Sequence, residues 1–349
     1  MGPRLRGDSR LMFKSLINVA TRRLVGAVPT VLLLSIVVFF VLRALPADPL
    51  ALLLPPNATQ ADADVVRKAL GLDRSIIVQY LIWLRDALSG NLGTSIAFRE
   101  PVTRLLANSL PATLELSFVG LVFALVISIP GGLLLYGTRG TVIENILDVL
   151  VVCMLSIPSF LWAIFLLLGF GVMLGWLPFS GRVDPGIVIP DGSGFLLIDY
   201  LVTLQLGYWQ NALSHLILPA MALALGFSPL VIRVLRSSLL EASEDHYVTV
   251  ARQRGLNERQ IILAHMLRNS ALPTITLIGA QFGFLFGGTL LVETIFSYPG
   301  IGNLMVQAVR NHDLPLIQGI ALVFCITTLA INTVVDILYV VLNPKLRRA

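Results

Sequence analysis

Long apolar stretches constrain this chain more than any other feature. A helix needs about 20 apolar residues to cross roughly 30 Å of hydrocarbon. Hydrophobic residues make up 56% of the 349, and a mean hydropathy of +0.84 is far above that of a soluble domain. The candidate spans are 24–45, 112–135, 146–177, 213–235, 275–292 and 316–342. The sequence therefore predicts an all-α membrane protein with six transmembrane helices, the third interrupted by Pro158.

Basic residues are distributed unevenly between these stretches. Most Lys and Arg residues lie before the first stretch, between the fourth and fifth, or after the sixth. Because short cytoplasmic loops carry an excess of Lys and Arg, we expect both termini and residues 241–272 to be cytoplasmic. The net charge of +5 reflects this bias, so we expect no nucleic-acid partner. The first stretch lacks a signal-peptide cleavage site, and we expect it to be retained as a helix.

This arrangement divides the chain into four regions. They are a cytoplasmic N-terminus with the first helix (1–45), an external segment (46–108), a core with the other five spans (109–342) and a cytoplasmic tail (343–349). We expect the external segment to form a cap of short helices or, alternatively, an interfacial amphipathic helix. Residues 178–208 form a second external loop, rich in Gly, Pro and Asp.

Prolines and glycines occur within the predicted spans. Prolines occur at Pro130, Pro158, Pro219 and Pro229. Each removes a helix hydrogen bond, so we expect kinks there. In the fifth span, Gly279, Gly283 and Gly287 recur every four residues and share one helix face. We expect that face to pack closely against a neighbouring helix, in this chain or in a partner, with substrate lining as the alternative.

Motifs for catalysis are absent from the sequence. No H-E-x-x-H, G-x-S-x-G or zinc-type Cys/His spacing occurs, and Cys153 and Cys325 do not form a disulfide framework. No lysine follows a glycine, so the chain has no P-loop. Glu115, Asp148 and Asp336 lie near span ends without an obvious cationic partner, which disfavours ion coupling. We therefore predict no enzyme and no catalytic, cofactor or metal site. A self-contained channel or carrier, and a membrane enzyme or respiratory subunit, remain as alternatives.

Residues 241–272 form a charged island between the fourth and fifth spans. A first short helix has an apolar edge made of Tyr247, Val250 and Ala251. Gly255 fits the position just after a helix end, where a left-handed residue stops the helix without strain. The island therefore begins with a helix and a glycine turn.

A second short helix is predicted to follow the turn. Asn257 is a candidate N-cap with Gln260 three residues later, and Glu258 suits the positive helix start. Ile262 and Met266 lie on one side of this helix. The pattern indicates a structured contact surface rather than a generic loop.

Five stretches, taken together and in order, resemble a known family. "DHYVTVARQRGL" (245–256) resembles the cytoplasmic loop of binding-protein-dependent ABC importer permeases of the dipeptide/oligopeptide type. The broad superfamily has an E-A-A-x-x-x-G core there; Ala251 and Gly255 match it, while Thr249 and Val250 replace Glu and the first Ala. The other stretches are "SGNLGTS" (89–95), "NSLPATLEL" (108–116), "VETIFSYPGIGNL" (292–304) and "INTVVDILYVVLNPKLR" (331–347).

The resemblance implies a type I ABC importer fold in a prokaryotic plasma (inner) membrane. It implies that the chain forms, with a second permease subunit, a pathway through the lipid for di- or oligopeptides. A solute-binding lipoprotein or periplasmic protein would deliver them, and two ATPase subunits would bind ATP and Mg. Nickel, glutathione or a sugar is the alternative substrate within this class.

The resemblance also implies roles for particular residues. The residues expected to dock the ATPase are Asp245, Tyr247, Ala251, Arg252, Gly255 and Leu256. The residues of the external family motif are Glu293, Phe296, Pro299 and Gly300.

Overall fold

The computed structural model describes residues 4–44, 73–190 and 192–342. The C-terminal tail and most of the first half of the predicted external segment lie outside the described residues. Within the described residues every regular element is helical, apart from one isolated bridge between Thr94 and Pro101. The prediction of an all-α protein is confirmed.

The helices differ widely in length. In chain order they are α1 (Arg4–Ala44), α4 (Ile76–Leu88), α5 (Val102–Gly137), α6 (Val142–Ser156), α7 (Ser159–Leu166), the π-helix η1 (Leu167–Met173), α8 (Leu196–Val202), α9 (Leu206–Ser243), α10 (His246–Gln253), α11 (Glu258–Gln260), the π-helix η2 (Ile261–Met266), α12 (Leu267–Ile295), α13 (Ile301–Arg310) and α14 (Leu314–Leu342).

Five described helices, α1, α5, α9, α12 and α14, are long and apolar enough to cross a membrane. The third predicted span is instead a pair, α6 and α7–η1, bent by 100°. The break falls at Pro158, and Ile157 before it is extended (φ −96°, ψ 116°) because a residue preceding proline avoids the helical conformation. Counting this pair as one broken span gives the six predicted. Helices α5 and α9 continue through Pro130, Pro219 and Pro229, so of the four prolines only Pro158 interrupts its helix, as expected.

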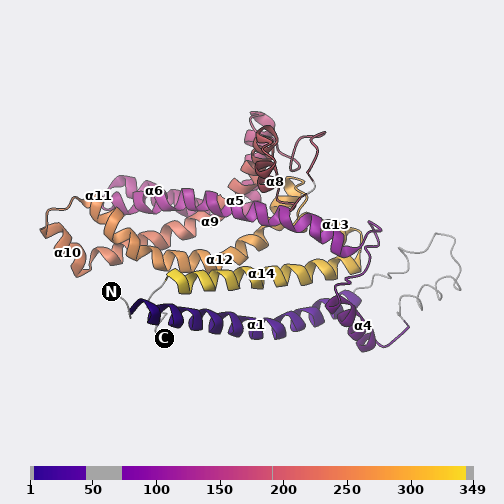
Figure 1. The fold of residues 1–349 in the computed structure, drawn as a ribbon. Coiled ribbons are helices and arrows are strands. Elements are labelled where there is room, and N and C mark those ends of the chain that lie inside the picture. Colours follow the sequence, from indigo (N-terminus) through magenta and orange to yellow (C-terminus); the bar gives the residue numbers. More distant parts are fainter. Residues whose placement is uncertain (1–3, 45–72, 191, 343–349) are drawn as a thin grey trace.

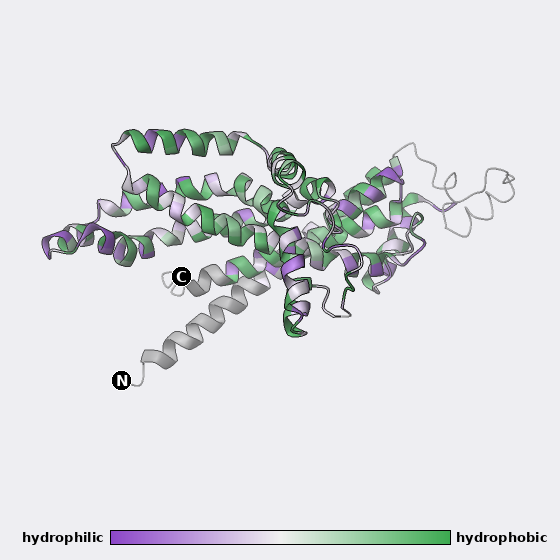
Figure 2. Cartoon of the chain, turned by 90° about the horizontal axis from the view of Figure 1, so that it is seen from above, coloured by the Kyte–Doolittle hydropathy of each residue, from purple (hydrophilic) through white to green (hydrophobic). Residues whose placement is uncertain are grey.

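The long helices form one elongated bundle (Figure 1). Helices α10 and α11 lie at one end, which we call the α10 end; α4 and α13 lie at the other, the α13 end. Helix α1 begins and α14 finishes toward the α10 end. Hydrophobic residues dominate the long helices, and hydrophilic residues gather at the tip around α10 (Figure 2).

The centre of the bundle is the crossing of α5 and α9. Small residues recur every four positions on both facing surfaces: Gly120, Ala124, Ser128 and Gly132 on α5, and Ala220, Ala224 and Ser228 on α9. A Cβ added to Gly120 would lie 3.3 Å from Leu223, and one added to Gly132 only 2.8 Å from Leu235. The serine hydroxyls donate to carbonyls of their own helices. This seam therefore brings two backbones close together without unpaired polar atoms.

The glycine face of α12 lies against α14. A Cβ added to Gly279 would overlap the side chain of Val335, and one added to Gly283 would lie 3.1 Å from Asn332 Oδ1. At Gly287 the nearest atom is Phe324 Cζ, at the ordinary contact distance of 3.9 Å. The close approach is thus concentrated at the first two glycines.

Several sequence expectations need correction. The island's second helix is not a separate element, because α11, η2 and α12 follow one another without interruption and it is the start of the fifth span. The loop 178–208 contains a short helix, α8, and α13 was not anticipated. Helix α5 begins at Val102, inside the predicted external segment.

The three carboxylates near span ends also have partners, contrary to expectation. Arg182 pairs with Glu115 at 2.6 Å, Arg236 lies 3.7 Å from Asp148, and Arg23 pairs with Asp336. All three arginines lie far from their carboxylates in sequence, so spacing along the chain gave no sign of them.

The described part of the external segment contributes α4, which packs on α1. Tyr80 is buried and its ring lies 5.4 Å from that of Phe39, while its hydroxyl lies 2.9 Å from Ser35 Oγ. Other positions of α4 expose apolar side chains, including Ile77 and Leu81. Part of the segment is therefore a short helix held against the first span.

The glycine face yields a stability prediction. Gly279→Leu should lower the thermal unfolding midpoint of the detergent-solubilised chain, because overpacking against Val335 costs about 1–3 kcal/mol. Gly287→Leu, on the same face, should have a smaller effect, because an added Cβ there would lie at the ordinary contact distance of 3.9 Å from Phe324 Cζ instead of overlapping its neighbour. Val335→Ala should recover part of the loss in Gly279→Leu. Equal unfolding midpoints for the two leucine variants would contradict this account of the α12–α14 contact.

Candidate functional site

The α10 end carries the first candidate site, residues 244–260 of the predicted island 241–272. We call these residues the coupling loop, because the resemblance implies that the island couples the chain to an ATPase. Helix α10 buries Val248 and Ala251, and Tyr247 is half-buried. Val250 is 43% exposed, so the buried edge differs from the predicted one by using Val248 in its place. Asp245 is the N-cap residue of α10, and its side chain makes no capping hydrogen bond.

A Schellman turn ends α10. Gly255 has φ +81°, the left-handed conformation expected from the sequence. The Leu256 amide donates to the Ala251 carbonyl at 3.3 Å, and the Gly255 amide donates to the Arg252 carbonyl at 2.9 Å. These two bonds define the motif and satisfy carbonyls at the helix end. The chain reverses sharply here because glycine carries no Cβ.

The start of α11 is fixed by a side-chain cap and an ion pair. Asn257 Oδ1 accepts a hydrogen bond from the Gln260 amide at 2.8 Å. Arg252 Nε donates to Glu258 Oε1 at 2.7 Å and so ties α10 to α11 across the turn. The hydrogen bond from Arg252 lowers the pKa of the Glu258 carboxyl, with further contributions from the charges of Arg252 and Arg139. The pair is therefore ionised at neutral pH.

The coupling loop has an exposed part, residues 252–260, which we call the crest, above a packed base. Every residue of 252–260 is exposed. Of the six residues expected to dock an ATPase, Asp245, Arg252, Gly255 and Leu256 are exposed, whereas Ala251 is buried and Tyr247 half-buried. The buried core beneath the crest includes Val248, Ala251, Ile261 and Met266 with Tyr136 of α5. The four exposed residues can contact a partner, whereas Tyr247 and Ala251 pack beneath them.

The second candidate site lies at the α13 end, around the buried carboxylate of Glu293. Glu293 accepts hydrogen bonds from the amides of Gly302 at 2.7 Å and Asn303 at 3.1 Å, in the first turn of α13. Thr113 of α5 donates its hydroxyl to Glu293 at 2.7 Å and accepts from the Ile301 amide at 2.8 Å. A carboxylate at a helix start satisfies free amides and suits the positive end of the helix dipole.

This arrangement explains the spacing of the external family motif. A Cβ on Gly300 would fall on the Glu293 carboxylate, and a Cβ on Gly302 would collide with Leu290. Phe296 is buried, and its carbonyl accepts from the Gly181 amide at 3.0 Å. Pro299 is exposed. The motif therefore positions α13 on the end of α12.

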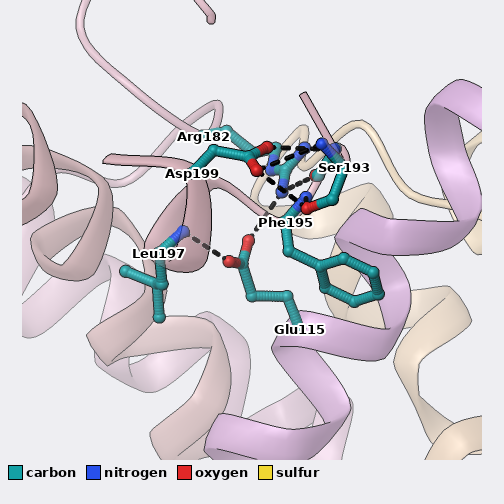
Figure 3. A network of polar contacts seen from close by, with 7 residues as sticks. Glu115, Arg182, Ser193, Phe195, Leu197 and Asp199 are labelled. Carbon is teal, nitrogen blue, oxygen red and sulfur yellow. Dashed lines mark hydrogen bonds and ion pairs between the residues drawn. The ribbon is translucent and has the colours of Figure 1, made fainter. Parts of the chain in front are cut away.

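A buried ion pair between Glu115 and Arg182 lies near Glu293. Glu115 is on α5, the helix that also carries Thr113. Arg182 donates to Glu115 of α5 at 2.6 Å and to the Gly194 carbonyl at 2.9 Å. Glu115 also accepts from the Leu197 amide at 2.7 Å, so it holds both the loop before α8 and the start of α8 (Figure 3). Asp199 accepts from the amides of Ser193 and Gly194 and braces the same loop. Removing one partner would leave a buried charge unpaired, so the ion pair holds the loop before α8 on the bundle.

Sequence reasoning missed the most connected residues of this second site. Thr113 and Arg182 act on carboxylates that lie 180 and 67 positions away in sequence. Thr113 lies within the stretch 108–116 that resembles the family, but that stretch gave no indication of its role, and Arg182 belongs to no recognisable local pattern. Only the fold brings them together.

The comparisons with known proteins cover nearly the whole chain. Residues 128–348 match the family "Binding-protein-dependent transport system inner membrane component", and residues 16–117 match the family "Binding-prot-dependent transport system membrane comp, N-term". The "Di/tripeptide transport system permease protein DppB" of Pseudomonas aeruginosa (strain UCBPP-PA14) is 36% identical over 336 residues, 95% of this chain and 99% of that protein.

Other relatives agree with this match. The "Dipeptide transport system permease protein DppB" of Escherichia coli (strain K12) is 35% identical over 93% of this chain and 97% of that protein. The "Glutathione transport system permease protein GsiC" of Shigella flexneri serotype 5b (strain 8401) is 32% identical over 95% of this chain and 99% of that protein.

A solved structure shares the fold. A chain of the inward-facing MetNI methionine ABC transporter superposes with a TM-score of 0.52 at 20% identity, covering 68% of this chain and 96% of that one. The likeness is one of fold, and it agrees with the predicted type I ABC importer architecture. The chain belongs to the family of inner membrane components of binding-protein-dependent transport systems.

Proposed function

We propose that this chain is a permease subunit of an ATP-driven importer and that it forms, with a second permease, the pathway for di- or oligopeptides. The observation that carries the proposal is the exposed crest of the coupling loop, where a Schellman turn and a capped helix start hold residues 252–260 clear of the bundle. The names of the dipeptide and di/tripeptide relatives support the peptide substrate.

The coupling loop is the surface that docks a separate ATPase. The crest combines the exposed arginines Arg252, Arg254 and Arg259 with the exposed apolar side chain of Leu256. This mixture suits a groove with acidic and apolar walls. ATP and Mg bind to two ATPase subunits, and their closure moves the coupling loop. Import is driven in this way by partners, which agrees with the absence of a P-loop from the sequence.

The α13 end faces the solute-binding lipoprotein or periplasmic protein. Glu293 and Glu115 there hold α13 and the loop before α8 in fixed positions on the bundle. A rigid outer surface favours a specific contact, because little conformational freedom is lost on binding. Glutathione is the second candidate substrate, favoured by the glutathione permease relative.

The proposal fixes the orientation of the chain. Because arginines cluster at the α10 end, that end and both termini lie in the cytoplasm. A cysteine in place of Asn257 should therefore react with a membrane-impermeant maleimide only from the cytoplasm, and a cysteine in place of Asn311 only from outside. Labelling of intact cells and of inverted vesicles measures this. Labelling of the Asn257 position in intact cells would reverse the orientation and refute the docking assignment.

The turn gives a direct test of ATPase docking. Gly255→Val places a β-branched residue in the left-handed conformation, at a strain of roughly 1–2 kcal/mol. The loop can relieve this strain by distorting the turn, and we expect ATPase subunits to bind about tenfold more weakly. Membrane levels should stay normal, because insertion depends on the apolar spans. Co-purification of the ATPase subunits and peptide uptake measure the two effects.

A matched control exists at the opposite end of the bundle. Gly90 has φ +85° and, like Gly255, no neighbouring atom within 4 Å of an added Cβ. Gly90→Val therefore introduces comparable backbone strain far from the coupling loop and should leave ATPase binding unchanged. Wild-type ATPase binding and uptake in Gly255→Val would show that the coupling loop is not the docking surface.

A further inference from the structure

Helices α5 and α12 meet at both ends of the bundle. At the α10 end, Tyr136 of α5 lies under the coupling loop beside Met266, which leads directly into α12. At the α13 end, Thr113 of α5 contacts Glu293 of α12. Tyr136 lies 23 positions after Thr113 on α5, a distance of about 35 Å along the helix. We call these contacts the Tyr136 junction and the Thr113 junction.

The Tyr136 junction connects α5 to the underside of the coupling loop. The Tyr136 side chain is 2% exposed and belongs to the same buried cluster as Val248 and Ala251 of α10. Its hydroxyl lies 4.0 Å from Met266 Sδ, and the guanidinium of Arg139 lies over its ring at 4.5 Å. A displacement of α10 or η2 therefore presses directly on the end of α5.

The Thr113 junction connects α5 to the outer surface. One hydroxyl group donates to Glu293 and accepts from the first amide of α13, while Glu293 accepts from the next two amides. A shift of α12 along α5 would change the position of Glu293 relative to Thr113. Since α13 begins on these same groups, α13 would move with them.

The bodies between the junctions are continuous helices. Helix α5 is continuous from Val102 to Gly137 and is held along its length by the small-residue seam with α9. The chain from Glu258 to Ile295 is also helical without interruption. Packed helices slide as units because their cores do not deform continuously.

We propose that the two junctions form one coupling frame: movement of the coupling loop shifts the start of α12 against α5 at Tyr136, and Thr113 passes that shift to Glu293 and α13. This inference rests on the proposed function, in which an ATPase moves the coupling loop and a binding protein contacts the α13 end. Tyr136 and Thr113 are positioning residues in this frame. They touch neither ATP nor peptide.

A double-mutant cycle tests the frame on the assembled complex in proteoliposomes. The readout is ATP hydrolysis stimulated by the cognate solute-binding protein loaded with dialanine, divided by hydrolysis without that protein. Thr113→Val removes the bridging hydroxyl at constant volume, and Tyr136→Leu removes the ring from beneath the loop. Each should reduce stimulation about fivefold or more, the usual size of coupling between sites. Thr113→Ser and Tyr136→Phe, which keep the hydroxyl and the ring, should retain stimulation.

The combination distinguishes a shared route from two local defects. Distant independent changes multiply their effects, whereas changes in one coupled unit do not. We expect the double variant to be no worse than the stronger single variant. Thr113→Val with Arg23→Gln, which breaks an α1–α14 ion pair outside both junctions, should give multiplied effects. If Tyr136→Leu fails to assemble, Arg139→Gln replaces it in the cycle. Arg139 is exposed, and its guanidinium lies over the Tyr136 ring.

The outcomes separate this inference from the proposed function. Multiplied effects in the Thr113–Tyr136 pair, or wild-type stimulation in either single variant, would overturn the frame while ATPase docking stands. A wild-type chain that neither binds ATPase subunits nor shows stimulation would overturn the proposed function itself. Unequal effects of Thr113→Val and Thr113→Ser, combined with a non-multiplying double variant, establish the frame.

Discussion

The close approach of α5 and α9 is the contact on which the rest of the structure depends. Without a hydrophobic force between helices in lipid, close packing of small residues and satisfied hydroxyls supplies the attraction. Gly120 and Gly132 of α5 have no room for a side chain beside α9. Because α5 carries Thr113 and Glu115 at one end and Tyr136 at the other, this seam fixes the positions of both polar ends.

Two different uses of helix termini follow from that fixed centre. At the α10 end, a helix stops at Gly255, and the next begins at Asn257 with its crest left free. At the α13 end, a helix begins on the buried carboxylate of Glu293, and its free amides are all engaged. The first arrangement leaves a surface for a partner to bind, and the second fastens an outer element to the bundle. The proposed importer uses both, since movement of the coupling loop at the α10 end has to reach the α13 end.

Local patterns in the sequence predicted much of this fold, and contacts between distant residues account for what they missed. The length of the apolar stretches located the spans. Gly255 predicted the turn and Asn257 predicted the helix cap, because each of these features depends on a few neighbouring residues. The continuity of η2 into α12 was missed, because charged residues around Arg268 suggested a separate helix. The partner of Glu115 was missed because Arg182 lies in a loop with no local signal. The glycine and glutamate of the external motif were noticed, but their purpose depends on α13 folding back onto α12.

Contact between the crest of the coupling loop and an ATPase subunit can be tested directly. A photo-crosslinking amino acid in place of Leu256, which is 37% exposed on the crest, measures this in the assembled complex. The account predicts an adduct with the ATPase subunit from the Leu256 position and none from Val309, which is 51% exposed at the α13 end. An assembled complex in which the Leu256 position yields no ATPase adduct would contradict it.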